Sequence, residues 1–327
     1  MIGIIANPAS GKDIRRLVSY ATVVDNNEKV NIVKRIVLAA QGCGVSSIFI
    51  MPDTYQIGYK VIEDLTLEKR LSAKVDILDM EMKGSHHDTT YAAKLMKEMN
   101  IKCVLVLGGD GTSRAVAKTI QEIPIIAIST GTNNVYPIMM EGTIAGMAAA
   151  AVCFGYGEKN IKRDKRIEIY KDKELLDIAL VDAVISKNLF VGAKAIWNVE
   201  NILKVITIKS HPASIGFSAL VGCKQIVSED EDYGLYVDLN NKYSQLIAPL
   251  GAGIIERIHM SEPKILRLNE EYVYLADTNG VIALDGEREI EFKQGEKLTF
   301  KITRKGPVRV KVSEVLENAQ KSGFFIR

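Results

Sequence analysis

Cysteine and histidine are scarce in this chain of 327 residues, which contains four of each. The cysteines are far apart, and no Cys-x-x-Cys pair or Cys/His pair has the spacing of metal ligands. Two of the histidines, His86 and His87, are adjacent and so point in different directions on most backbones. We therefore expect thiols in a reducing, cytoplasmic compartment rather than disulfides or a structural zinc site.

Long apolar runs and an excess of one charge are also missing. The net charge is only +2, and the basic residues between positions 159 and 166 alternate with acids, as in a solvated linker. The least polar run, 143–154, is too short and too rich in small residues to span a bilayer. The first residues read as a strand and carry no leader signal. We expect a soluble protein with no nucleic-acid partner and no stable membrane association.

In the first half of the sequence, apolar strand patterns alternate with helical patterns. The predicted strands are 2–5, 47–51, 75–78, 104–107 and 124–129, and helical spacing follows at 27–40, 59–71, 89–100 and 144–153. Such an alternation predicts an α/β domain with a parallel sheet covered by helices. Asn7, Asp110 and Thr130 each follow a strand, so they are expected at the carboxyl edge, where ligands of these sheets bind.

The most informative stretch is Gly108-Gly109-Asp110-Gly111-Thr112. Its glycines allow a sharp turn with close backbone approach, and Thr112 and Ser113 are expected to cap a helix over 114–120. A new helix directs backbone N–H groups at whatever lies above it, which favours an anion. A carboxylate beside bound phosphate is costly unless it serves the chemistry, so the turn indicates phosphoryl transfer with Asp110 as base or metal organiser.

Two further turns have phosphate-binding character. After the first strand, Asn7-Pro8-Ala9-Ser10-Gly11-Lys12 approaches the P-loop pattern but has Ala6 and Asp13 where that pattern needs glycine and a hydroxyl. A P-loop NTPase is excluded, although Ser10, Gly11 and Lys12 still offer a hydroxyl, an N–H group and a cation. The second turn suits the phosphates or ribose of a nucleotide and comprises Thr130, Gly131, Thr132, Asn133 and Asn134. An ordinary polar turn remains an alternative for each.

Beyond Gly155 the pattern changes to short strands. They are predicted at 166–170, 175–185, 205–208, 234–239, 272–276, 281–284, 290–292, 297–302 and 308–312, with turn residues between several of them. We predict a nucleotide-binding domain over 1–157, joined by a helical segment at 313–327. The β-rich domain over 158–312 is predicted to be antiparallel and to serve substrate binding and oligomerisation.

These motifs resemble the NAD kinase/diacylglycerol kinase superfamily, and in style its branch of ATP-NAD kinase-like proteins related to acetoin catabolism protein X. The resemblance rests on Asn7-Pro8-Ala9-Ser10-Gly11, on the turn from Gly108 to Thr112, and on Gly131-Thr132-Asn133-Asn134. In the second half, Ser214-Ile215-Gly216-Phe217-Ser218 and Asp285-Gly286-Glu287 are similar to later family segments. The resemblance covers most of the chain.

The resemblance implies an ATP-dependent kinase that uses Mg²⁺. It places Asp110 near the accepting hydroxyl and assigns phosphate contacts to Gly108, Gly109, Gly111 and Thr112. Asp285 is then a magnesium candidate, and Glu287 is an alternative base. The implied substrate residues are Asp182, Ser214, Gly216 and Ser218, and the implied assembly is a homo-oligomer, a dimer or tetramer.

The acceptor is where the sequence departs from NAD kinases. Val181 stands where those enzymes carry an asparagine that contacts the dinucleotide, and valine cannot make that hydrogen bond. The acceptor is therefore NAD or another soluble metabolite, with the departure weighing against NAD. Rival hypotheses are a lipid kinase and a nucleotide-binding regulator without turnover. A Rossmann dehydrogenase is excluded because the turn lacks the third glycine and puts an acid against the pyrophosphate.

Overall fold

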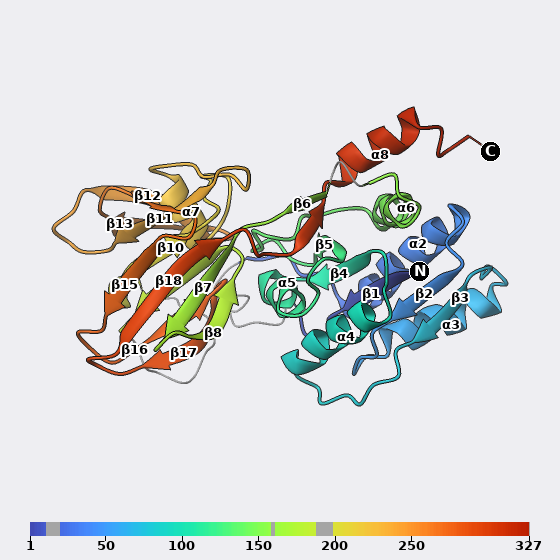
Figure 1. Cartoon of the computed structure of the whole chain (residues 1–327), viewed down its shortest axis with the longest axis horizontal. Coiled ribbons are helices and arrows are strands. Elements are labelled where there is room, and N and C mark those ends of the chain that lie inside the picture. The colour runs from blue at the N-terminus through green and yellow to red at the C-terminus, as the bar shows by residue number, and fades with distance from the viewer. Residues whose placement is uncertain (11–19, 158–160, 188–198, 327) are drawn as a thin grey trace.

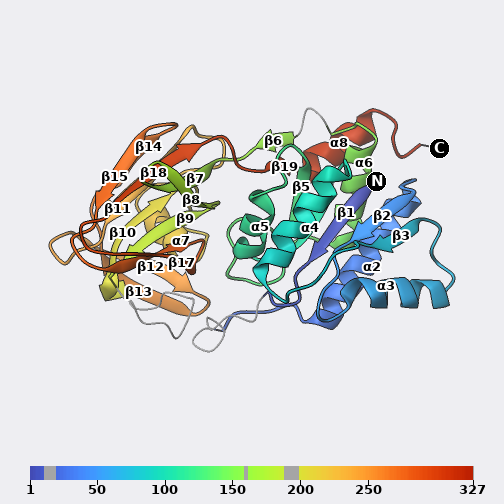
Figure 2. The same ribbon diagram turned by 60° about the horizontal axis from the view of Figure 1, so that its bottom comes forward.

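The computed structural model describes residues 1–10, 20–157, 161–187 and 199–326. The chain forms two halves that lie side by side, with both termini in the first half (Figure 1). Turning the molecule shows the same separation and the two connecting segments between the halves (Figure 2).

The first half is built on a mostly parallel sheet. Its described strands run in the order β3-β2-β1-β4-β5-β19-β6, and only β6 is antiparallel to its neighbour. Their bounds are β1 (Ile2–Ala6), β2 (Ser47–Ile50), β3 (Lys74–Ile77), β4 (Val104–Gly108), β5 (Pro124–Ser129), β6 (Ile161–Arg163) and β19 (Val308–Val310). The order reverses between β1 and β4, so the loops that follow these two strands open the crevice typical of a ligand site.

Helices cover both faces of this sheet because its central strands are apolar on both sides. Ile2 and Ile4 of β1 enter one core cluster, and Ile5 enters the opposite one. The first cluster is closed by α2 (Asn26–Gly42), α3 (Ile57–Leu67), α6 (Gly142–Cys153) and α8 (Val312–Lys321), and the second by α4 (His86–Glu98) and α5 (Asp110–Ala117). Asp25 caps α2 by accepting the Glu28 N–H at 2.8 Å, as its sequence predicts.

The second half is an antiparallel β structure. One sheet has the order β14-β11-β10-β9-β16-β17 and another β15-β18-β7-β8, with a core cluster between them that includes Ile169, Ile206 and Phe300. The bounds are β7 (Arg166–Lys171), β8 (Glu174–Ala179), β9 (Asp182–Ser186), β10 (Ile202–Thr207), β11 (Tyr233–Asp238), β14 (Lys264–Arg267), β15 (Glu271–Leu275), β16 (Gly280–Leu284), β17 (Glu287–Phe292) and β18 (Lys297–Thr303). The 3₁₀ turn η2 (Val199–Asn201), the helix α7 (Phe217–Gly222) and the hairpin β12 (Gln245–Gly251) with β13 (Ile254–His259) complete it.

Three element predictions need correction, and several elements had not been predicted. The strand predicted at 175–185 is two strands, because the backbone at Leu180 and Val181 turns to donate hydrogen bonds to Asp285. The strand predicted at 308–312 pairs with β5 in the first sheet rather than within the β-rich half. The helix α5 begins at Asp110, earlier than expected, and the β12–β13 hairpin had no counterpart among the predicted strands.

The two crossings between the halves meet at one edge of the first sheet. β6 leads out and β19 leads back, and they pair with each other antiparallel. Just beyond them, the Asp164 N–H donates to the Pro307 carbonyl at 2.9 Å, and the Gly306 N–H donates to the Asp164 carbonyl at 3.0 Å. The ends of the second half are therefore hydrogen-bonded neighbours.

The predicted fold class, an α/β first half followed by a β-rich second half, is confirmed. No helix among the described residues combines the length and apolarity needed to cross a membrane.

Candidate active site

Asp110 occupies the first turn of α5, directly after β4. Gly109 is the N-cap, with an extended backbone at φ −102° and ψ −168°, so Thr112 and Ser113 lie inside the helix rather than capping it. The Asp110 carboxylate accepts the Tyr136 N–H at 2.7 Å and the Val135 N–H at 3.1 Å, which fixes its orientation. A carboxylate at a helix N-terminus is also favoured by the positive end of the helix dipole.

Two glycines of this turn are needed for space. A Cβ on Gly109 would lie 2.8 Å from the Asn134 side-chain oxygen, and one on Gly111 would lie 3.0 Å from both carboxylate oxygens of Glu287. Asn134 cannot yield easily, because its amide donates to Ser129 Oγ at 2.8 Å and to the Gly131 carbonyl at 3.2 Å. The glycines thus let the third turn and the second half close onto the first helix turn.

Side-chain hydrogen bonds join the three predicted turns. Asn7 Nδ2 donates to Thr112 Oγ1 at 2.9 Å, and the hydroxyls of Ser10 and Thr130 are 2.9 Å apart. Beneath the first turn, the buried Lys29 donates from Nζ to the carbonyls of Asn7 at 3.0 Å and Ser10 at 3.1 Å. The convergence expected from the ends of three strands is therefore present in the fold.

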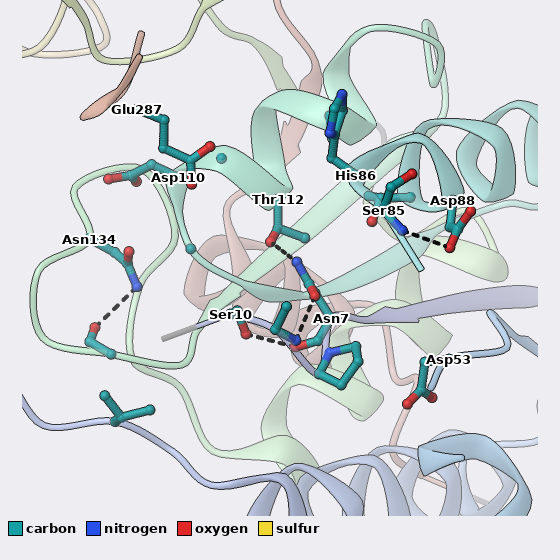
Figure 3. Close-up of a pocket in the computed structure, with 18 of the residues that line it drawn as sticks. Asn7, Ser10, Asp53, Ser85, His86, Asp88, Asp110, Thr112, Asn134 and Glu287 are labelled. Carbon is teal, nitrogen blue, oxygen red and sulfur yellow. Dashed lines mark hydrogen bonds between the residues drawn. The ribbon is translucent and has the colours of Figure 1, made fainter. Parts of the chain in front are cut away.

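These turns line a cavity of about 470 Å³ at the carboxyl edge of the sheet (Figure 3). Of the nucleotide-contacting residues predicted from sequence, those on its wall are Asn7, Ser10, Gly109, Gly111, Thr112, Gly131, Thr132, Asn133 and Asn134, and both proposed catalytic acids, Asp110 and Glu287, join them. Thr130 and Gly108 lie behind the wall, Thr130 against Ser10 and Gly108 under the Thr112 side chain. Gly11 and Lys12 lie outside the described residues.

A second, smaller cavity of about 160 Å³ adjoins the first on the side of the β-rich half. Asp110 and Asn133 line both cavities. The predicted substrate residues Asp182 and Gly216 are on its wall, together with Val181. Asp110 therefore stands at the boundary between a glycine-lined cavity and a cavity formed largely by the second half.

Ser214 and Ser218, also predicted as substrate residues, do not line either cavity. The Ser218 hydroxyl is buried and donates to the Lys209 carbonyl at 2.6 Å, which holds the start of α7. The Ser214 N–H closes a turn on the His211 carbonyl at 3.0 Å. Their contacts are structural.

Asp285, predicted as a metal ligand, has backbone partners instead. Its carboxylate accepts N–H groups from Leu180 at 3.0 Å, Val181 at 2.8 Å and Asp182 at 3.3 Å. Burial raises the pKa of Asp285 to about 7, Arg114 opposes that rise, and the negative charge of Asp110 adds to it. Among the described residues no group of three Asp, Glu, His or Cys side chains is placed to hold a metal.

Arg114 joins the two halves beneath the site, a role that the sequence did not reveal. Its buried guanidinium on α5 lies 3.4 Å from Asp177, 3.5 Å from Asp285 and 3.6 Å from Glu287, all in the second half. Since Glu287 also packs against Gly111, this cation helps to hold the Glu287 carboxylate at the glycine-rich start of α5.

A buried network also supports the loop that holds Asp110. The Tyr136 hydroxyl donates to Asp164 Oδ2 at 2.7 Å, and Arg309 of β19 binds both Asp164 oxygens at 2.9 and 3.1 Å. Burial and the neighbouring Asp164 carboxylate raise the pKa of Tyr136 well above its ordinary value, so the hydroxyl remains a donor. The orientation of Asp110 is thereby tied to the connection between the halves.

Comparisons with known proteins identify the family. The family model of the ATP-NAD kinase N-terminal domain matches residues 2–174, and that of the acetoin catabolism protein X C-terminal domain matches residues 165–305. The chain is 35% identical over 313 residues to the acetoin catabolism protein X of Cupriavidus necator, covering 91% of this chain and 86% of the relative. The chain belongs to the ATP-NAD kinase-like family that includes acetoin catabolism protein X. It is thus a kinase-like protein, and the resemblance inferred from its motifs is confirmed.

The far end of the larger cavity of this kinase-like protein contains residues that the sequence interpretation missed. They come from the loop after β2 and the start of α4, and Figure 3 shows Asp53, Ser85, His86 and Asp88 there, across the cavity from Asp110. Asp53 accepts the N–H groups of Tyr55 and Ile57, each at 2.9 Å, and burial raises its pKa. One signal was available: β2 is parallel to β1, so the loop after it ends at the same edge.

Proposed function

We propose that this protein is an ATP-dependent phosphotransferase that acts on a hydroxyl of a small molecule. One observation carries the proposal: Asp110 lies on the wall of two adjoining cavities, one formed by glycine-rich turns and one formed largely by the second half. A binding protein gains nothing from a carboxylate between two ligand sites. An enzyme that moves a phosphoryl group from one to the other does, and this favours an enzyme over a regulator.

The larger cavity is assigned to the nucleotide. The start of α5 and the turns at Asn7–Ser10 and Gly131–Asn134 offer N–H groups, hydroxyls and amides, which suit the oxygens of phosphates. The opposite end, near Asp53 and His86, is left for the nucleoside. Membership of the family supports ATP as the donor.

Magnesium fits this arrangement as a partner of the nucleotide. When bound it would neutralise charge on the phosphates, and it is usually held by one or two carboxylates together with phosphate oxygens and waters. Of the four described carboxylates on the larger cavity, Asp53 and Asp88 lie at its far end, so Asp110 and Glu287 are the ones that could contribute. Because no described cluster is built to hold a metal by itself, we assign the ion to the bound nucleotide.

In the proposed reaction the acceptor hydroxyl oxygen bonds to the γ-phosphorus while the bond to the bridging oxygen breaks and ADP leaves. The hydroxyl proton passes to the Asp110 carboxylate, which the N–H groups of Val135 and Tyr136 hold in place. A positioned base contributes about 10²–10⁴-fold to such a step. Assembly into a dimer or tetramer and a cytoplasmic location stay predictions.

The test is acceptor-dependent ADP release by wild type and Asp110→Asn, screened over NAD, polyols, sugars and nucleosides. We expect the variant to lose at least about a hundredfold in kcat. The control is Asp64→Asn, which alters a surface acid paired with Lys34 at 2.6 Å and should leave kcat within about twofold. Equal turnover by wild type and Asp110→Asn would overturn the role of Asp110.

Glu287→Gln separates the two candidate bases in the same assay. If Asp110 is the base, Glu287→Gln retains more activity than Asp110→Asn. Both variants should still bind the nucleotide, and ATP at about 100 times its Kd should stabilise each by about 2.7 kcal/mol, read as a rise in Tm. Wild type that shows no stabilisation at millimolar ATP would contradict the nucleotide site itself.

A further inference from the structure

We propose that the phosphoryl acceptor is a short polyol that carries no negative charge. The inference rests on the proposed function, because it takes the smaller cavity beside Asp110 as the acceptor site. It goes beyond that function by naming the class of acceptor and by excluding hydroxy acids and phosphorylated hydroxyl compounds.

The charge of the cavity is the first observation. Four of the described residues that line it are acids, Asp110, Asp182, Glu256 and Asp285, and none of those lining residues is Lys, Arg or His. Among the described lining residues a carboxylate or phosphate on the acceptor would find no cation to pair with, and the carboxylates of Asp110, Asp182 and Glu256 would repel it. Hydroxyl groups suit it, since each donates a hydrogen bond that a carboxylate accepts.

Two cations that the structure describes in contact with the wall, Arg114 and Lys209, have partners outside the cavity. Arg114 approaches Asp285 from outside the cavity and divides its charge among Asp177, Asp285 and Glu287. Lys209 donates from Nζ to the Val135 carbonyl at 3.2 Å and lies 3.8 Å from Glu229. These side chains lower the cost of the acids in the folded protein, but neither of them lines the cavity.

The size and the apolar part of the cavity are the second observation. About 160 Å³ corresponds to roughly five water molecules at ~30 Å³ each, well below the ~300 Å³ at which pockets for larger ligands begin. The apolar residues that line the cavity are Val135, Val181, Ile215, Phe217, Leu250 and Ile254. A short carbon chain can contact these apolar side chains while its hydroxyls face the carboxylates, that of Asp110 among them.

The experiment compares acceptors that share a skeleton and differ in charge. Glycerol, glycerate and 3-amino-1,2-propanediol are neutral, anionic and cationic three-carbon diols or triols. Erythritol with erythronate and ribitol with ribonate extend the comparison to four and five carbons. ADP release is measured for each with wild type, and we expect kcat/KM for each acid to be at least about tenfold below that of its neutral partner, with the amine at least equal to glycerol.

A charge reversal then tests the assigned wall. Glu256→Lys should raise the ratio of acid to neutral turnover by roughly fivefold, because Glu256 is exposed and such a charge is worth up to about 1 kcal/mol. The control is Glu174→Lys on β8, an exposed strand residue that does not line the cavity, and it should leave the ratio unchanged.

The possible failures are distinguishable. Acids that match or exceed their neutral partners would overturn the inference and leave the phosphotransferase proposal intact, as would turnover of NAD with none of the polyols. Identical shifts in Glu256→Lys and Glu174→Lys would overturn the assignment of the wall. If no acceptor in either screen stimulates ADP release above the Asp110→Asn background, the proposed function itself fails and this inference with it.

Discussion

The two halves contribute to the candidate site in different ways. In the first half, the groups that face the larger cavity stand in short stretches directly after strands, as at Asn7–Ser10 after β1 and Gly109–Thr112 after β4. In the second half, the residues around the smaller cavity come from four separate segments, 181–182, 215–217, 250–256 and 285–286. The first-half wall of the larger cavity is thus encoded locally, and the wall of the smaller cavity is produced by long-range packing.

Under the proposed function, this difference would let the chemistry and the acceptor vary separately. A change at Ile215 or Leu250 alters the smaller cavity without touching the glycine turns, whereas Asp110 and Asn133 belong to both cavities. We call the contact of Arg114 with the three acids of the second half the seam between the halves. Changes at the seam, in each half and in the connection between the halves should therefore have separable effects. Four predictions test this in order of decreasing size.

The largest effect is expected at the seam between the halves. Arg114→Met leaves Asp177, Asp285 and Glu287 close together without the buried guanidinium that now lies among them. Removing one partner of a buried ion pair costs about 3–5 kcal/mol, so we expect a loss of that size in the free energy of unfolding by urea. Arg70→Met is the control, since its pair with Glu68 is exposed and worth about 0–1 kcal/mol. Similar losses of unfolding free energy in both variants would show that the ion pairs of Arg114 contribute no more than an exposed ion pair.

The second effect is a pH dependence that belongs to the second half. The Asp285 pKa is raised by burial from 3.8 to about 7, so the folded state holds this proton more tightly than the unfolded state. The resulting stability is fully present below about pH 4 and is lost as pH rises through about 7. Between pH 5 and pH 8 wild type should lose about 2–3 kcal/mol relative to Asp285→Asn.

Asparagine is a suitable replacement at this position, because it tolerates the left-handed backbone of Asp285, φ 52°. The measurement is urea unfolding of both proteins across this range. Parallel pH profiles would contradict the raised pKa of Asp285.

A smaller effect is expected in the phosphate-binding turn of the first half. Gly109→Ala places a methyl group 2.8 Å from the Asn134 side-chain oxygen. Because Asn134 is held by Ser129 and Gly131, the turn must shift, at a cost of about 1–3 kcal/mol. We expect the KM for ATP to rise about tenfold or more, with a smaller change in the acceptor KM. Gly42→Ala, where a Cβ meets nothing within 4 Å, is the control. Equal effects on both KM values would contradict the assignment of the nucleotide to the first half and of the acceptor to the second half.

The smallest effect concerns the support of the Asp110 loop. Tyr136→Phe removes the 2.7 Å hydrogen bond to Asp164 and leaves the N–H that Asp110 accepts. We expect kcat to fall several-fold with little change in the KM for ATP, and stability to fall by about 1–3 kcal/mol. Tyr170→Phe removes a bond of the same length to Glu168, away from both cavities, and should affect stability alone. A fall in kcat shared by both variants would assign it to general destabilisation.

Sequence reasoning reached the first half well because each feature there depends on neighbours in the chain. The apolar runs before Asn7, Asp110 and Thr130 predict strands, parallel strands end at one edge, and the turns therefore meet. The N-terminus of α5 was misjudged because a glycine N-cap leaves no side-chain signal in the sequence. Lys29 was missed for a related reason. Its hydrogen-bond partners are backbone carbonyls, which every residue has, so the sequence does not indicate them.

The second half was less predictable because its features depend on distant segments. The residues near Asp285 in the sequence do not indicate that it accepts the backbone N–H groups of Leu180, Val181 and Asp182. This contact also divides the predicted long strand into two strands. Ser218 sits in a plausible motif, but tertiary packing turns its hydroxyl to the Lys209 carbonyl. The sequence alone indicated an ordinary helix residue at Arg114, and only the fold shows that three acids surround it.

The hydrogen bonds that join Asp164 with Gly306 and Pro307 have a consequence for how such proteins can diversify. A segment whose two ends meet can be exchanged for another of different length or architecture without displacing the strand edge from which it hangs. Under the proposed function, one base and one phosphate-binding surface would then serve many interchangeable modules. Transplanting residues 165–305 between relatives should therefore carry acceptor preference along while donor preference stays with the recipient.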